Sequence, residues 1–202
     1  MKKSTSTRPS TSSWTPAEIQ NLNELEQKYC TCQRCPLGAT RTNFVFGVGH
    51  PHTPLMFIGE GPGADEDRLG EPFVGKAGKL LTKMIYSIGI DRPDIYIANV
   101  VKCRPPENRT PLPDEIAKCL PILARQIELV NPKLIVTLGN VPTQALIPNA
   151  PGITKARGQI LRYQNWKVIP TFHPAYLLRN PPAMESAWED FQKIAATVFV
   201  TV

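Results

Sequence analysis

The sequence lacks any long hydrophobic run, and this absence limits where the protein can act. No stretch of about 18 apolar residues occurs, so we expect no membrane-spanning segment and no membrane partner. No apolar segment follows Lys2 and Lys3, and a secretory signal is therefore not predicted either. We expect a cytoplasmic protein.

The first thirteen residues lack both acidic residues and apolar anchors. We predict a disordered basic tail at 1–13 and a single domain at 14–202, which acts as a monomer. The tail carries Lys2, Lys3 and Arg8, half of the formal net charge of +6. The modest positive charge that remains permits binding to nucleic acid but does not demonstrate it.

Cysteine is unevenly distributed, since Cys30, Cys32 and Cys35 account for three of the five cysteines. Without an export signal, disulfides are disfavoured, and metal binding becomes a more favoured role for these cysteines. Cys32 and Cys35 have the spacing of a two-ligand bite, and Cys103 and Cys119 lie far downstream. The pattern fits one site of four thiolates, holding zinc or an iron–sulfur group, or else unrelated buried thiols.

Hydrophobic patterning alternates short apolar runs with helical periodicity. This alternation predicts an α/β protein, a three-layer α/β/α sandwich around a mostly parallel sheet of roughly four strands. The expected strands are 55–59, 95–101, 133–139 and 168–172, with a possible antiparallel partner at 159–163. The expected helices are 16–29, 80–89, 114–130, 140–147 and 183–199, with Pro121 starting a new turn or a kink in the third.

Ligand sites in such sheets lie at the carboxyl ends of the strands. The segments at these ends are 59–63, Asn99, Gly139-Asn140 and His173-Pro174. The first has the glycine content of a dinucleotide loop but the wrong spacing, and Pro62 removes an amide that would face phosphate. A nucleotide cofactor is therefore disfavoured.

Three separated motifs carry a family resemblance: GEGPGADED at 59–67 with GEPFVG at 70–75, NVVKCRPP at 99–106 with Asn108-Arg109, and HPAYLLR at 173–179. Together they resemble the signatures of the family 4 uracil-DNA glycosylases, in order, over residues 30–199. The resemblance implies a four-stranded parallel sheet between helices. It also implies a 4Fe–4S cluster that ties the N-terminal arm to the 103–119 loop. Its implied ligands are Cys32, Cys35, Cys103 and Cys119, with Cys30 as a bystander.

The implied activity is that of a monofunctional DNA glycosylase, which flips uracil out of single- or double-stranded DNA and hydrolyses its N-glycosidic bond. Phe73 is expected to stack on the flipped ring, and the Gly61 amide to meet the base. Asn99 is expected to donate to O4 and to accept from N3–H, a pattern that cytosine does not match.

The remaining chemistry concerns the leaving group and the attacking water. His173 is expected to hydrogen-bond O2 as negative charge develops there. Glu60 is the first choice to hold the water, with Glu66 and Asp67 as alternatives. Glu66 is otherwise expected to shape the wall that rejects the methyl group of thymine.

Contacts to DNA are expected from two segments. Lys102, Arg104 and Arg109 lie on the connection after the second strand and are candidates for phosphate contacts, together with Arg179. Leu177 or Leu178 is the candidate wedge that fills the hole left by a flipped base.

Two other functions fit the same fold. One is an iron–sulfur DNA-binding protein without catalysis, although the presence of Glu60, Asn99 and His173 argues against it. The other is a glycosylase for another deaminated base, such as hypoxanthine, or one that traps the sugar covalently. The 104–113 connection has no histidine to serve as such a nucleophile.

Overall fold

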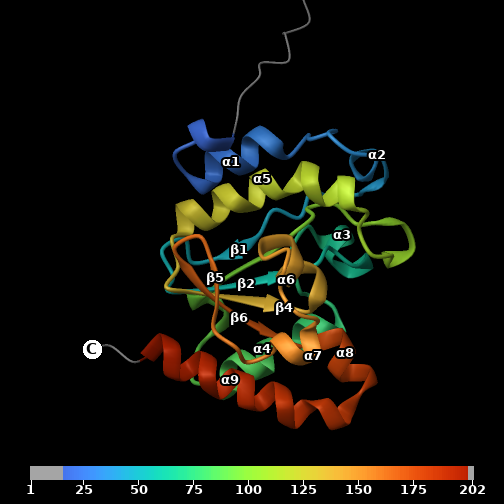
Figure 1. Cartoon of the computed structure of the whole chain (residues 1–202). Helices are drawn as coiled ribbons and strands as arrows, with labels where there is room; N and C mark the ends of the chain where they lie inside the picture. The colour runs from blue at the N-terminus through green and yellow to red at the C-terminus, as the bar shows by residue number, and fades with distance from the viewer. Residues whose placement is uncertain (1–15, 200–202) are drawn as a thin grey trace, which may run out of the picture.

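A computed structural model of the chain, which describes residues 16–199, has a six-stranded sheet at its centre (Figure 1). The strand order is β1-β3-β2-β4-β6-β5. The strands are β1 (Val48–Gly49), β2 (Leu55–Gly59), β3 (Tyr96–Asn99), β4 (Leu134–Leu138), β5 (Leu161–Tyr163) and β6 (Trp166–Thr171). The predicted tail at 1–13 lies outside the described residues, and the single domain at 14–202 stays a prediction.

The expected sheet was too small. Its four central strands β3, β2, β4 and β6 are parallel as predicted, but β1 and β5 add antiparallel edges and make the sheet mixed. The β5 partner was anticipated, whereas β1 was missed because it has only two residues, Val48 and Gly49. Gly49 has φ +125, and an added Cβ would collide with the Ile95 carbonyl oxygen.

The central strands are recognisable in the sequence because both of their faces are covered. All residues of β2 and of β4 are buried, so they read as continuous apolar runs rather than as alternating patterns. Each face of the sheet has its own hydrophobic core. Phe57 of β2 points to one core, and its neighbours Met56 and Ile58 point to the other.

Helices cover both faces, which confirms the three-layer arrangement (Figure 1). The helices α1 (Leu22–Tyr29) and α5 (Pro113–Val130) lie over one face, and α4 (Lys76–Ser87) and α9 (Met184–Phe199) over the other. None of the helices in residues 16–199 is long and apolar enough to span a membrane.

Two helix predictions need correction. The expected helix at 16–29 is divided into a 3-10 turn (Pro16–Glu18) and α1, because Asn21 caps α1 by accepting a hydrogen bond from the Glu24 amide. The helix α5 continues through Pro121 without a break.

Short elements that were not predicted place several residues of the site. The helix α3 (Ala64–Leu69) lies in the segment expected to be a glycine-rich loop, and α8 (Pro174–Arg179) begins directly after His173. The other unpredicted short elements are α2 (Leu37–Thr40), α7 (Ile153–Ala156) and 3-10 turns at Arg92–Asp94, Pro106–Asn108 and Pro181–Ala183. The short helix α6 (Asn140–Leu146) confirms the helix expected at 140–147.

Candidate active site and cysteine site

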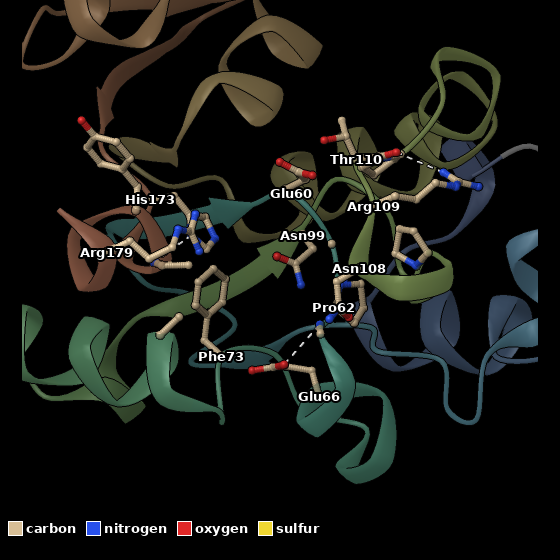
Figure 2. A pocket seen from close by; sticks show the side chains of 17 residues that line it. Glu60, Pro62, Glu66, Phe73, Asn99, Asn108, Arg109, Thr110, His173 and Arg179 are labelled. Atoms are coloured by element: carbon tan, nitrogen blue, oxygen red, sulfur yellow. Dashed lines mark hydrogen bonds between the residues drawn. The ribbon is translucent and has the colours of Figure 1, made fainter.

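A cavity of about 510 Å³ opens at the carboxyl ends of the parallel strands, as predicted (Figure 2). It is called the pocket below. All six side chains or amides expected to recognise or cleave the substrate line it: Glu60, Gly61, Glu66, Phe73, Asn99 and His173. Figure 2 shows His173 and Phe73 on one side, Glu60 and Asn99 at the centre, and the 108–110 segment opposite.

Asn99, the last residue of β3, lies at the base of this arrangement and is only 2% exposed. Its side-chain oxygen Oδ1 is buried and accepts no hydrogen bond from the described residues. A buried acceptor without a donor is costly, and a ligand with an N–H group would satisfy it. Gly59 pairs with Asn99 across the sheet, and a Cβ on Gly59 would lie 2.4 Å from that oxygen. Because Gly59 has no side chain, the Asn99 side chain can occupy this space.

Phe73 forms the wall beside His173, with ring centroids 5.7 Å apart. Its backbone has φ +55, a left-handed conformation that is strained for a residue with a bulky side chain. The backbone of Gly78 approaches so closely that an added Cβ would lie 1.9 Å from the Phe73 carbonyl oxygen. Strain of this kind is typical of functional sites, where the surrounding structure holds a side chain in place.

His173 caps the N-terminus of α8, and its Nδ1 accepts a hydrogen bond from the Ala175 amide at 3.1 Å. The proton of the neutral ring is therefore on Nε2. Burial and, to a smaller extent, the positive charge of Arg179 lower the pKa of His173 to about 4, against the opposing effect of Glu66. At neutral pH this side chain is an uncharged hydrogen-bond donor that lines the pocket.

Glu60 lines the pocket next to Thr110, which hydrogen-bonds its carboxylate. Burial raises the pKa of Glu60, and the bond from Thr110 acts in the opposite direction. A partly buried carboxylate with a raised pKa is suited to hold and deprotonate water. This geometry keeps Glu60 as the first choice for that role.

The two alternative acids have other tasks. Glu66 accepts hydrogen bonds from the amides of Gly63, Val74 and Gly75, so its carboxylate fixes two loops of the pocket wall to each other. Asp67 is 5% exposed and accepts from the amides of Thr42 and Asn43. Asp67 was therefore a wrong alternative for the residue that holds the water. The bonds of Glu66 agree with its expected role in shaping the pocket wall.

The basic loop needs a larger correction. Lys102 is fully buried and cannot reach a phosphate. Arg109 is paired with the carboxylate of Glu115 through both of its terminal nitrogens, at 2.9 and 2.7 Å. Arg104 hydrogen-bonds Asn108 at 2.8 Å on the surface. Sequence spacing could not reveal these partners because they depend on how the loop meets α5.

The two leucines of α8 differ sharply in exposure. Leu177 is 1% exposed and belongs to the core beneath the sheet, so its expected role as a wedge is wrong. Leu178 is 48% exposed, and Arg179 lines the pocket on the same short helix. A helix begun by His173 thus presents one apolar and one basic side chain beside the pocket.

The 104–113 connection contributes lining residues that received no role from the sequence. Asn108 and Thr110 line the pocket, and Glu107 and Asn108 have consecutive positive φ values of 53 and 54. The Asn108-Arg109 pair did belong to the quoted motif, and Asn108, a residue type that tolerates positive φ, is the signal that could have marked this strained segment.

Cys32, Cys35, Cys103 and Cys119 are brought together from four points in the chain, and they are called the cysteine site below. Their sulfurs interact electrostatically: Cys103 with those of Cys35 and Cys32, and Cys119 with those of Cys103 and Cys32. Cys30 is exposed, and its thiol hydrogen-bonds the Gln27 carbonyl oxygen instead.

Hydrogen-bond donors surround these sulfurs. Arg41, which was missed in the sequence, donates to the Cys103 sulfur at 3.0 Å and to the carbonyl oxygens of Cys32 and Cys30. The Lys102 amide donates to the sulfur of Cys119. Burial raises the pKa of Cys103 and raises that of Cys119 to about 11, and these donors act in the opposite direction, towards the thiolate. Four thiolates are the ligand set of a 4Fe–4S cluster. Within residues 16–199, no group of three Cys, His, Asp or Glu side chains fits a single metal ion.

The chain resembles known proteins along most of its length. Residues 46–192 match the family described as the Uracil DNA glycosylase superfamily. A type-4 uracil-DNA glycosylase from Thermotoga maritima is 49% identical over 169 residues, which cover 83% of this chain and 87% of the relative. One from Archaeoglobus fulgidus is 43% identical over 184 residues, 87% of this chain and 92% of the relative. One from Sulfurisphaera tokodaii is 46% identical over 185 residues, 87% of this chain and 84% of the relative.

Proposed function

The chain belongs to the type-4 branch of the uracil-DNA glycosylase superfamily, and on this premise we propose that it excises uracil from DNA by hydrolysing the N-glycosidic bond. Uracil in DNA marks a deaminated cytosine, and its removal starts base-excision repair. The single observation that carries the proposal for this pocket is the buried, unpartnered Oδ1 of Asn99. Uracil offers the missing donor at N3–H.

Recognition of the base follows from the walls around that atom. The flipped ring stacks on Phe73, whose strained backbone holds the aromatic plane beside the carboxyl end of β3. Asn99 then accepts from N3–H through Oδ1 and donates to O4 through Nδ2. Cytosine has an acceptor at N3 and a donor at position 4, so it would leave both groups of Asn99 unmatched.

Bond cleavage leaves negative charge on the departing base, mostly near O2. The Nε2–H of His173 donates to O2, and its tautomer is set in advance by the Nδ1 bond to the Ala175 amide. A donor that is already neutral and oriented needs no rearrangement as charge develops. Glu60 holds the attacking water at the sugar and takes up its proton.

The cysteine site fits the cofactor that this family implies. We assign Cys32, Cys35, Cys103 and Cys119 as ligands of a 4Fe–4S cluster, with Arg41 donating to the Cys103 sulfur. When bound, such a cluster supplies a rigid cross-link rather than redox chemistry, because glycosidic hydrolysis transfers no electrons. The cross-link joins the N-terminal arm to α5 and to the loop that lines the pocket.

DNA binding is assigned to the two segments beside the pocket. Arg104 and Arg179 contact phosphates, and Leu178 enters the space that the flipped base leaves in a duplex.

A direct assay tests the proposed function. The protein is incubated with a labelled oligonucleotide that contains uracil, and strands carrying thymine or hypoxanthine serve as controls. Release of uracil alone is the expected result. Hypoxanthine release without uracil release would support a glycosylase for another base, and DNA binding without any base release would support the non-catalytic alternative.

A further inference from the structure

Lys102 is a buried lysine that the mechanism above does not use. It is 0% exposed, and its Nζ donates to the Asn99 carbonyl oxygen at 2.8 Å and to the Gln126 side-chain oxygen. Across residues 16–199, no carboxylate lies within ion-pair distance of this ammonium group. A buried cation that meets only neutral oxygens is expensive, so a countercharge is to be expected nearby.

Two sulfurs of the cysteine site are neighbours of Lys102. Cys103 follows Lys102 in the chain, and the Lys102 amide donates to the sulfur of Cys119. Four thiolates around a 4Fe–4S cluster carry net negative charge, which a buried ammonium group can balance.

On its other side, the same ammonium group fixes the end of β3. It bonds the backbone of Asn99, the residue whose side chain reads the base. Its second acceptor, Gln126, is held in turn by hydrogen bonds to Phe46 and to the Tyr96 hydroxyl. Lys102 therefore lies between the cysteine site and the pocket, in contact with both.

We propose that Lys102 is a positioning residue that joins the two sites, as countercharge to the thiolate-bound cluster and as the donor that fixes Asn99. The second role rests on the proposed uracil excision, and the first rests only on the proposed 4Fe–4S cluster. Base recognition depends on an assembled cysteine site by this route. With the thiolates empty or removed, the ammonium group is left buried without a countercharge at the end of β3.

The first test compares Lys102→Met with Lys118→Met. Lys118 also neighbours a ligand cysteine, but its side chain is 47% exposed and pairs with Asp114. The reduction potential of the cluster is measured by protein-film voltammetry. Loss of a buried positive charge disfavours the added electron, so Lys102→Met should lower the potential, whereas solvent screening leaves Lys118→Met unchanged. Equal potentials in wild type and Lys102→Met would overturn the countercharge role.

The second test measures affinity for a duplex containing 2′-fluoro-2′-deoxyuridine, which resists cleavage. Lys102→Met should weaken this binding about tenfold, because the bond from a charged donor to the Asn99 backbone is lost. Binding to the same duplex with thymidine should not change, since it reports phosphate contacts alone. Unchanged affinity for the uracil duplex would overturn the positioning role, and a wild type without uracil release would overturn the proposed function instead.

The third test asks whether the effect of Lys102→Met on the unfolding temperature has opposite signs with and without the cluster. In the cluster-loaded protein, Lys102→Met should lower the unfolding temperature. In a Cys119→Ser background, where the cation lacks its countercharge, the same substitution should raise the unfolding temperature or the soluble yield. Equal destabilisation in both backgrounds contradicts the proposal. Lys102→Gln removes the charge with less apolar bulk and serves for all three tests if Lys102→Met does not fold.

Discussion

The pocket and the cysteine site differ in which hydrogen-bonding groups they offer to a ligand. The pocket has an acceptor without a donor at Asn99, a strained backbone at Phe73 and an imidazole kept neutral at His173. At the cysteine site, by contrast, the Arg41 guanidinium and the Lys102 amide both donate to sulfur. The pocket suits a neutral planar substrate that binds and dissociates, and the cysteine site suits an anionic cofactor that stays bound. The contrast shows that unsatisfied groups can indicate the charge of what binds.

The largest effect is expected where the permanent group is lost. Cys103→Ser and Cys119→Ser each remove a thiolate ligand, and they should abolish the visible absorbance of the cluster and most of the soluble yield. Cys30→Ser is the matched control, because Cys30 is exposed and its thiol hydrogen-bonds the Gln27 carbonyl oxygen. Loss of absorbance in Cys30→Ser would overturn the ligand set, and stoichiometric zinc without iron after anaerobic purification would overturn the cluster.

At the pocket, substitution of Asn99 should spare the fold and change the chemistry. Asn99→Ala should reduce uracil release about 100-fold, because each unmatched buried group costs roughly 1–3 kcal/mol. Asn99→Asp should lose most uracil release and gain weak cytosine release, strongest at low pH where a protonated carboxyl can donate to N3. The measurement is base release from matched strands that contain uracil or cytosine. Retention of near wild-type uracil release by both variants would show that Asn99 does not read the base.

His173 should make the stability of the folded state depend on pH. Burial lowers the pKa of His173 from 6.5 to about 4, so the unfolded chain binds a proton that the folded chain refuses between these values. Stability should therefore decrease as the pH falls from 6.5 towards 4, by a total on the order of 3 kcal/mol.

His173→Asn keeps an acceptor for the Ala175 amide but cannot titrate, so this part of the pH dependence should vanish. Its rate of uracil release should also fall about 10²- to 10³-fold. Urea unfolding at several pH values compares the two proteins. Identical pH profiles would mean that the imidazole is not desolvated in the folded state.

The smallest effect concerns the loop that connects the two regions. Arg104 is a surface donor, whereas Arg109 is neutralised by Glu115, and only the first is expected to release a counterion on binding DNA. Arg104→Gln should make the slope of log K against log salt shallower by about 0.9, and Arg109→Gln should change it less. Fluorescence anisotropy over a range of salt concentrations measures both slopes. A larger change for Arg109→Gln would show that its ion pair opens on DNA.

The sequence was most informative where backbone hydrogen bonding and burial leave few choices. The runs that became β2 and β4 had to be buried strands, and the strand-end rule brought Asn99 and His173 to one edge. It was least informative where tertiary partners decide a side chain's direction. Lys102 and Leu177 are residue types that often contact DNA, but here both side chains are buried. No pattern in the sequence around Arg41 predicts its hydrogen bond to the Cys103 sulfur.

The parallel arrangement of the sheet also determines the order in which the site residues are synthesised. Parallel neighbours need long crossovers, so Glu60, Asn99 and His173 are widely separated in the chain although they share one pocket. Ribosomes deliver these segments one after another, and β6 must join β4 before the residue that follows it can take its place. A nascent chain that has not yet reached His173 lacks the donor to O2 and should release no uracil. The ability to hydrolyse the glycosidic bond is thus acquired only after the last of these three segments has been synthesised.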